Sequence, residues 1–181
     1  MRRFRGIALM LVALALCVPA AQAQEAGQRV FEIYAGYYIP GIDDLDNDLT
    51  YGLRFGGRPT EAWGWSLQAG TLDLNQNNTR PLAGTVRDAQ GYFVDLDGIW
   101  YVAGSNFGLF GGVGFGTVDI ELQDTNEDIS DDAFTYNFGV HYLWNFGTNS
   151  LVKPEIRLRK WEGDTYEKTD EEYSISYGWR F

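Results

Sequence analysis

The last nine residues of the chain alternate strictly between two kinds of side chain. From Tyr173 to Phe181, every odd position is aromatic or branched apolar, and every even position is Ser, Gly or Arg. Successive side chains of a β-strand point to opposite faces of a sheet, so this segment predicts a strand with one apolar face and one small or polar face. Such a strand suits a closed sheet with lipid on one side and a narrow interior on the other.

The same alternation recurs along the chain and divides it into eight candidate strands. Helical periodicity fits none of them well, and their Gly, aromatic and β-branched residues argue against helix. The predicted strands cover residues 31–38, 49–56, 63–70, 92–100, 107–116, 134–142, 152–159 and 173–181. Pro154 cannot donate a ladder hydrogen bond, so irregular pairing is expected beside it.

The connections between these strands alternate in length. Three are short turns, at 57–61, 103–106 and 145–150, and four are longer and polar, at 41–48, 74–89, 119–132 and 162–172. Outer-membrane barrels have short periplasmic turns and longer extracellular loops. The prediction is therefore all-β: an eight-stranded antiparallel up-and-down transmembrane β-barrel with both chain ends in the periplasm.

A soluble barrel with an apolar interior would show the same alternation. Here the polar face is rich in Gly and Ser. These small residues suit a narrow lumen, whereas a strand surface in water would favour residues of higher β-propensity. The apolar face is aromatic near the strand ends, as expected where strands cross the two membrane interfaces. These two patterns favour the membrane barrel.

Residues 1–23 predict a secretory signal peptide, which leaves 24–181 as the barrel. Three arginines precede an apolar run over residues 7–18, and Ala21-Gln22-Ala23 is an A-x-A cleavage site. A competing interpretation would lipidate Cys17, but Leu16 occupies the position where the lipoprotein motif requires a small residue. Cleavage removes the single cysteine, so no disulfide, thiolate nucleophile or cysteine metal site is expected.

The charged residues divide between the loops and the predicted lumen. The formal net charge is −11, or −14 without the three arginines of the leader, so the chain is not expected to bind nucleic acid. Most of the acidic excess lies in the loops, whereas the lumen face is nearly balanced. Because unpaired charges in a narrow lumen are costly, we expect a salt-bridge network that plugs it.

In this network, Arg157 and Arg159 are expected to reach Asp95 and Asp97 across the lumen, with Glu155 and Arg54 below them. A gate in which the pairs exchange partners is the alternative interpretation of the same charges. The predicted members are Glu32, Arg54, Asp95, Asp97, Glu155, Arg157 and Arg159.

The sequence offers little support for catalysis or metal binding. His141 is the single histidine and falls on the lumen face toward the periplasm, away from the leaflet that holds lipid A, and no serine–histidine–acid set is evident. The acidic run from Asp43 to Asp48 supplies oxygen ligands for Ca²⁺ or Mg²⁺, but it lacks EF-hand spacing and is more simply a solvated loop. We therefore predict no enzyme, cofactor or metal site.

Five segments of the chain are similar to a known family of barrels: Tyr34–Pro40, Tyr51–Gly56, Asn106–Gly116, Lys153–Arg159 and Tyr177–Phe181. In these segments the chain resembles the OmpA/OmpX-type small outer-membrane β-barrel family. The resemblance covers nearly the whole mature chain, and it implies a monomer in the Gram-negative outer membrane that contacts lipids and lipopolysaccharide. No peptidoglycan-binding domain follows the barrel, so a cell-wall tether is not expected.

In that family, an aromatic final strand ending in Phe is recognised by the barrel-assembly machinery after delivery by periplasmic chaperones. The resemblance implies this role for Tyr177, Trp179 and Phe181. For the finished barrel we expect a structural or surface-interaction role. The alternatives are transport, as a porin-like small-solute channel or a conduit for hydrophobic ligands, and third, a lipid A-modifying enzyme. The loops that would carry recognition show only charge, so no extracellular ligand is predicted.

Overall fold

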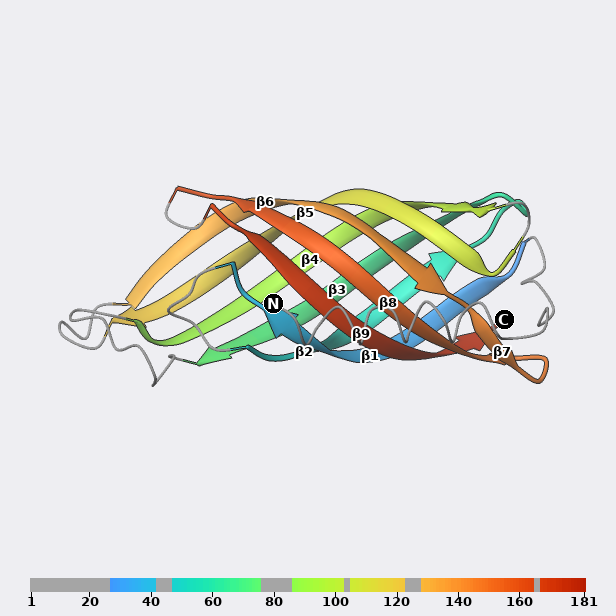
Figure 1. Cartoon of the computed structure of the whole chain (residues 1–181), viewed down its shortest axis with the longest axis horizontal. Coiled ribbons are helices and arrows are strands. Elements are labelled where there is room, and N and C mark those ends of the chain that lie inside the picture. Colours follow the sequence, from blue (N-terminus) through green and yellow to red (C-terminus); the bar gives the residue numbers. More distant parts are fainter. Residues whose placement is uncertain (1–26, 42–46, 76–85, 103–104, 123–127, 165–166) are drawn as a thin grey trace, which may run out of the picture.

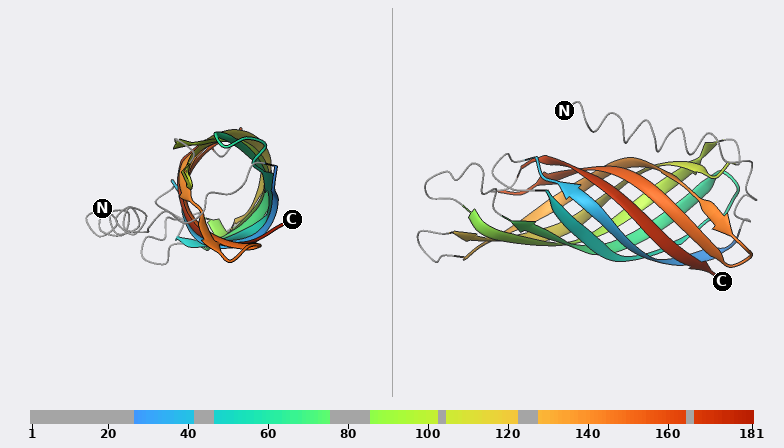
Figure 2. Two further views of the ribbon diagram at one scale, coloured as in Figure 1. Left: turned by 90° about the vertical axis from the view of Figure 1, so that its right-hand side faces the viewer. Right: turned by 60° about the horizontal axis from the view of Figure 1, so that its bottom comes forward.

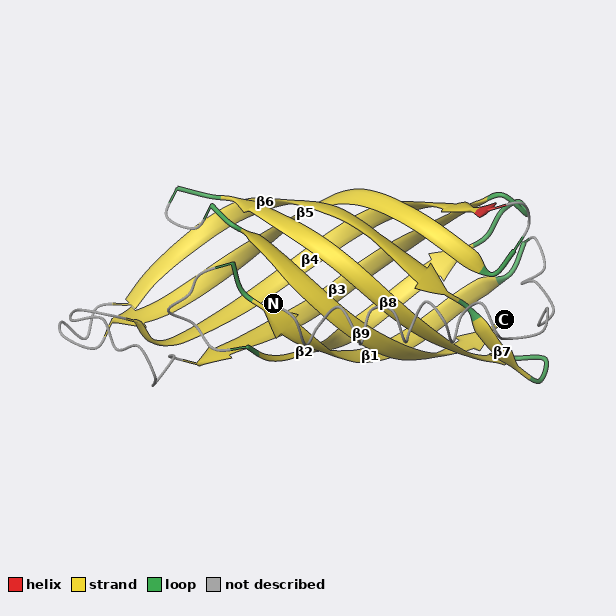
Figure 3. Ribbon diagram, viewed as in Figure 1, coloured by secondary structure: helices red, strands yellow, loops and turns green. Residues whose placement is uncertain are grey.

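The computed structural model describes residues 27–41, 47–75, 86–102, 105–122, 128–164 and 167–181. Strand makes up almost all of this part of the chain (Figure 3). The predicted signal peptide, residues 1–23, lies outside it and stays a prediction. In the described ranges, no helix is long and apolar enough to cross a membrane.

The strands form one antiparallel sheet that closes on itself, as the end-on view in Figure 2 shows. In the described ranges, they are β1 (Arg29–Ile39), β2 (Asp48–Gly57), β3 (Trp63–Asn75), β4 (Val86–Tyr101), β5 (Phe107–Leu122), β6 (Asp128–Tyr142), β7 (Trp144–Phe146), β8 (Ser150–Glu162) and β9 (Thr169–Arg180). Each strand pairs with its neighbour in the chain, except that β6 and β7 both pair with β8 and not with each other. The barrel closes where β1 meets β9.

The short strand β7 continues β6 beyond Leu143, and both pair with β8, so the nine strands make eight passes. This confirms the predicted eight-stranded barrel. Pairing of β8 with β6 ends at Glu155 and resumes with β7 at Val152, which leaves Tyr142 opposite Pro154. Because Pro154 has no N–H to donate, the irregularity expected there is confirmed.

The two ends of the barrel differ, as Figure 1 shows along the long axis. Phe181 and the short connections lie at one end, which we call the turn end. The opposite end, where β1 stops at Ile39 and β2 starts at Asp48, we call the loop end. In the orientation common to outer-membrane barrels, the turn end faces the periplasm.

The predicted loops at 74–89, 119–132 and 162–172 were too long. Strand β5 continues to Leu122, β6 starts at Asp128, and β9 starts at Thr169. At the loop end, outward positions of these strands carry acids such as Asp119, Asp132 and Glu171, so the apolar outer face that marks a membrane strand fades there although the ladder continues.

The two faces of the sheet are clearly distinguished by burial. Along β1 and β8, exposed or half-buried residues alternate with buried ones. The outward side chains are mainly apolar, such as Leu49, Phe134 and Phe138, and each of these three is about 60% exposed in the isolated chain (59%, 63% and 60%). The inward side chains fill the lumen, which is therefore the place to look for a functional site.

Candidate functional site

In the described part of the chain, the lumen contains three layers of buried side chains. An aromatic-rich loop-end cluster comprises Tyr34, Tyr38, Leu72, Phe93, Val118, Ala133 and Trp161. A turn-end cluster comprises Val30, Ile99, Tyr101, Phe110, Leu143 and Leu151. Between the two clusters lies a layer of charged residues contributed mainly by β4 and β8.

Three arginines and three carboxylates alternate in a closed ring within this charged layer. The ring runs from Arg157 through Glu155, Arg54, Glu172, Arg159 and Asp95 back to Arg157. Its N–O distances range from 2.7 Å, between Arg159 and Asp95, to 3.5 Å. All six side chains are at most 2% exposed. Each charge therefore has opposite charges on both sides, which offsets the cost of removing it from water.

The remaining charged residues attach to this ring. Asp97 accepts a 2.8 Å contact from Arg157. Lys153 lies 2.7 Å from Glu32, which also accepts a 2.8 Å hydrogen bond from the Ser176 hydroxyl. Glu32 lies 4.0 Å from Arg54, so the Lys153–Glu32 pair extends the network toward the turn end.

The structure thus places all seven residues of the predicted network in one connected set. Arg157 contacts both Asp95 and Asp97, whereas the acids that Arg159 contacts are Asp95 and Glu172. Glu172 was missed because the sequence prediction placed it in a loop. Its signal was present, since the inward positions 174 and 176 continue the same period of two back to Glu172.

The arginines also stack on aromatic rings of the two flanking clusters. In the loop-end cluster, the guanidinium carbons of Arg54 and Arg159 lie 4.1 Å and 3.7 Å from the ring centres of Tyr34 and Phe93. In the turn-end cluster, that of Arg157 lies 4.6 Å from the ring centre of Phe110. A guanidinium group donates hydrogen bonds at its edge and is weakly hydrated on its face, so an aromatic ring is a suitable cover. The aromatic clusters therefore support the ring of ion pairs as well as covering it.

Glycines on the inner face of β5 provide the space for the acids of β4. A Cβ atom added at Gly112 would lie 2.2 Å from an Asp97 oxygen, and one added at Gly114 would lie 2.1 Å from an Asp95 oxygen. Both distances are far shorter than any ordinary contact. The network therefore requires glycine at these two inward positions of β5.

A second hydrogen-bonded set closes the loop-end cluster. The Trp161 indole donates to the Tyr38 hydroxyl at 2.9 Å, and that hydroxyl donates to Asp170. The Gly41 amide donates to the other Asp170 oxygen at 2.6 Å. These contacts tie β1, β8, β9 and the first residues beyond β1 together.

His141 lies in the lumen and is 3% exposed. Its Nδ1 atom is 3.9 Å from Glu155, and its ring stacks on Phe110 at 5.8 Å and approaches Tyr101 at 5.7 Å. These neighbours supply no serine nucleophile beside the imidazole.

Metal-binding residues do not gather in the described part of the chain, where no group of three or more His, Cys, Asp or Glu residues is placed to hold an ion. Most of the acidic run from Asp43 to Asp48 lies outside the described residues. Asp48 itself accepts a local hydrogen bond from the Leu49 amide at 2.7 Å.

The three predicted recognition residues of the final strand lie on the outer face. Tyr177, Trp179 and Phe181 are 39%, 42% and 69% exposed. Trp179 stacks with Phe31 at 6.5 Å, and Phe181 stacks with Phe55 at 6.2 Å. The end of β9 therefore lies against the first two strands on the membrane side.

A closed antiparallel barrel with an apolar outer face and ion pairs inside has the architecture of an outer-membrane protein. Residues 8–181 match the family described as outer membrane protein beta-barrel domain. The chain belongs to this family. Its place is accordingly the outer membrane of a Gram-negative cell, where its outward side chains contact lipid.

Several solved structures share this fold. They include the N-terminal beta-barrel domain of Pseudomonas aeruginosa OprF (15% identity, TM-score 0.57, 87% of this chain and 100% of that chain). Ail of Yersinia pestis is 16% identical (TM-score 0.58, 87% and 100%), and a major outer membrane protein of Thermus thermophilus is 13% identical (TM-score 0.62, 84% and 99%). At such identities the likeness shows the fold. No curated protein of similar sequence is matched.

Proposed function

We propose that this protein is a plugged outer-membrane barrel with a structural or surface-interaction role. The observation that carries the proposal is the ring of six charged side chains, each at most 2% exposed, between two apolar clusters. An ion crossing the lumen would have to separate pairs that are buried away from water. Leaving one such charge without its partner costs about 3–5 kcal/mol.

Planar-bilayer recording tests this proposal directly. Purified protein whose folding is verified by its heat-modifiable migration on gels should insert without producing large, stable conductance steps. Stable steps that scale with salt concentration would contradict a plugged lumen and support the small-solute channel or the exchanging gate.

A conduit for hydrophobic ligands is the second candidate, and the break in pairing opposite Pro154 favours it. A ligand could leave the barrel sideways only where the wall lacks ladder bonds, and Tyr142 faces Pro154 without one. A Tyr142→Cys, Pro154→Cys disulfide would lock this position. A plugged barrel should pass no hydrophobic probe into vesicles with or without the lock, whereas uptake that the lock abolishes would establish the conduit.

We further infer that the lumen performs no lipid A chemistry, because Glu155 and two aromatic rings surround His141. Incubation with labelled lipopolysaccharide tests this inference, and it should return the substrate unchanged. Release or transfer of an acyl chain that is absent from a control without the protein would contradict the inference.

We propose that Tyr177, Trp179 and Phe181 form the signal read by the barrel-assembly machinery after chaperone delivery. Deleting Phe181 should lower the amount of folded barrel in cells and leave refolding in detergent largely intact. Phe146→Ala is the matched control, because this outward aromatic residue at the same end is 47% exposed and lies outside the final strand. Normal assembly of the deletion variant would refute the role.

We propose that the protein is a monomer and that its acidic loop-end surface repels polyanions. Ail of Yersinia pestis has been solved in complex with the heparin analogue sucrose octasulfate. In this chain the exposed residues at the loop end include the acids Asp119, Asp132, Glu162 and Glu171. We therefore expect no retention on immobilised heparin at physiological salt, and a single-chain mass by native mass spectrometry.

A further inference from the structure

The two ends of the ion-pair network differ in their access to solvent. Toward the turn end, the side chains of Glu32 and Lys153 are 9% and 4% exposed to solvent. Deeper in the network, the side chains of Asp95, Arg159 and Glu172 are 0% exposed. Exposure therefore falls along the network from the turn end inward.

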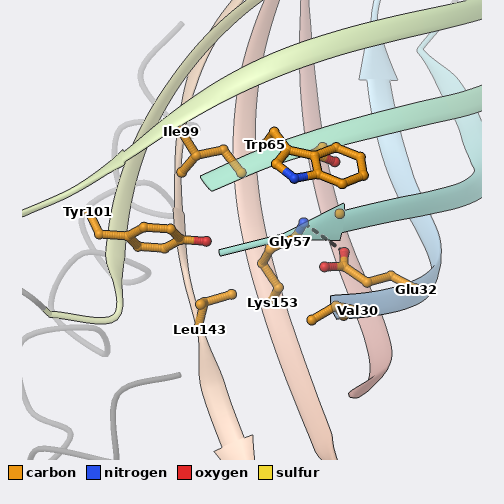
Figure 4. A pocket seen from close by; sticks show the side chains of 10 residues that line it. Val30, Glu32, Gly57, Trp65, Ile99, Tyr101, Leu143 and Lys153 are labelled. Atoms are coloured by element: carbon orange, nitrogen blue, oxygen red, sulfur yellow. Dashed lines mark ion pairs between the residues drawn. The ribbon is translucent and has the colours of Figure 1, made fainter. Parts of the chain in front are cut away.

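A cavity lies at the more exposed end of this gradient, as Figure 4 shows. Its volume is about 20 Å³, and its lining residues are Val30, Glu32, Gly56, Gly57, Trp65, Ser66, Ile99, Tyr101, Leu143 and Lys153. In Figure 4 the Lys153–Glu32 ion pair lies across the cavity from Tyr101 and Ile99.

The size and lining of this cavity suit one water molecule. A bound water needs about 10–15 Å³ and two to four polar partners. Glu32, Lys153 and Ser66 are among the lining residues and carry charged or hydrogen-bonding side chains, and Trp65 and Tyr101 also carry polar atoms. Glycines and apolar residues complete the wall. A wholly apolar cavity of this size would stay dry, whereas this one has both charge and hydrogen-bonding groups.

We propose that the turn-end cavity is a water-binding site open to the periplasmic side, and that water enters the lumen only as far as the Lys153–Glu32 pair. This inference rests on the proposed plugged function. The site gives Lys153 a partly hydrated setting at the edge of a dry network, which lowers the cost of placing its charge there. The turn-end part of the lumen is thus a short vestibule with one entrance, closed at its inner end by the ion-pair network.

Single cysteines can test the entrance, because the sequence beyond residue 23 contains none. Ser66→Cys places a thiol in the cavity wall, and Thr135→Cys places one beside Asp95, where the native threonine is 0% exposed and its hydroxyl donates at 2.6 Å. Thr50→Cys, also 0% exposed, probes the lumen from the loop end. Each folded variant is treated with methyl methanethiosulfonate, a small thiol reagent, and the adduct is followed by mass spectrometry.

We expect Ser66→Cys to react about tenfold faster than the other two variants, which react only through transient opening. If all three react slowly, the vestibule is refuted and the plug stands. If Thr135→Cys and Ser66→Cys both react fast, the plugged function itself fails. Faster reaction at Thr50→Cys than at Ser66→Cys would place the entrance at the loop end and overturn the inference.

A measurement on the unsubstituted protein covers the case in which a variant fails to fold. In detergent micelles, magnetisation transfer from water should reach protons of Ser66 and not those of Thr135. Equal transfer to both residues, or transfer to neither, would contradict a vestibule that ends at Lys153.

Discussion

Strands β5 and β8 line the same lumen with opposite kinds of residue. The inward positions of β8 are Leu151, Lys153, Glu155, Arg157, Arg159 and Trp161, all large and buried. Of the six inward positions of β5 from 108 to 118, four are glycines: Gly108, Gly112, Gly114 and Gly116. The interior of an eight-stranded barrel is only wide enough to be filled by side chains, so long side chains from one strand require glycines on another.

This contrast separates two contributions to stability. Strand β8 supplies ion pairs, and stability should fall when one partner of a pair is removed. Strand β5 supplies space for the side chains of other strands, and stability should fall when an atom is added there. The predictions below test each contribution, beginning with the largest expected effect.

Arg159→Met should be the most damaging single change on β8. It leaves the carboxylates of Asp95 and Glu172 short of a cation and removes the stacking on Phe93. Breaking a buried ion pair on one side costs about 3–5 kcal/mol. Urea unfolding in detergent micelles, followed by tryptophan fluorescence, measures the loss.

Lys160→Met is the matched control for that change. Lys160 is the next residue of the same strand, but it points outward, is 46% exposed, and lies 3.8 Å and 3.7 Å from two exposed glutamates. Exposed ion pairs contribute about 0–1 kcal/mol, so this variant should unfold nearly as the parent does. Equal losses for the two variants would mean that the ring contributes no more than a surface contact.

Gly114→Ala tests the space that β5 provides. The added Cβ would lie 2.1 Å from an Asp95 oxygen and 2.4 Å from the Val94 carbonyl oxygen, so backbone as well as side chain must move. Overpacking of this kind costs about 1–3 kcal/mol. The free energy of unfolding measures this cost under the conditions used for Arg159→Met.

Gly98→Ala is the corresponding control for added volume. Its Cβ would meet only the Gly111 carbonyl oxygen, at 3.9 Å, on the outer face. Alanine is favoured over glycine in a strand by about 0.5–1 kcal/mol, so this variant should be neutral or slightly stabilised. If Gly114→Ala behaved like Gly98→Ala, the glycines of β5 would not be the reason that the network fits.

Sequence reasoning captured the elements for which the membrane imposes a pattern. Lipid on one side and lumen on the other force a period of two, so the positions of the strands and the inward direction of residues such as Asp95 and Arg157 could be predicted. Beyond the lipid both faces can be polar, and there the prediction failed: residues 119–122 and 128–132 are strand.

The partners within the network were harder to predict than its members. Which acid meets which arginine depends on strand stagger and side-chain reach, and neither can be read from alternation. Glu172 shows this limit, because it joins Arg54 and Arg159 and thereby closes the ring. The stacking of the arginines on aromatic rings was likewise missed. Inward aromatic residues such as Phe93 interrupt an otherwise small and polar face, and alternation alone gives no reason for them.

Trp161→Phe should have a smaller effect than the changes to the ring or to β5. It keeps an aromatic ring beside Phe93 and loses the indole hydrogen bond to the Tyr38 hydroxyl, which spans 2.9 Å. A buried hydrogen bond contributes about 0.5–1.5 kcal/mol. Urea unfolding should show a loss in that range, and a loss as large as that of Arg159→Met would mean that the loop-end cluster, rather than the ring, dominates stability.

Pro154→Ala should have the smallest effect, because two consequences oppose each other. The change supplies an N–H group opposite Tyr142, where the pairing of β8 with β6 and β7 is broken, and a new hydrogen bond is worth about 0.5–1.5 kcal/mol. It also frees the unfolded chain from the proline restriction, which costs about 0.4–1 kcal/mol. Stability should therefore change little, while hydrogen exchange should show a protected amide at position 154. If that amide exchanged as fast as those of the turn at residues 147–149, the break would come from the geometry of the wall and not from the missing donor.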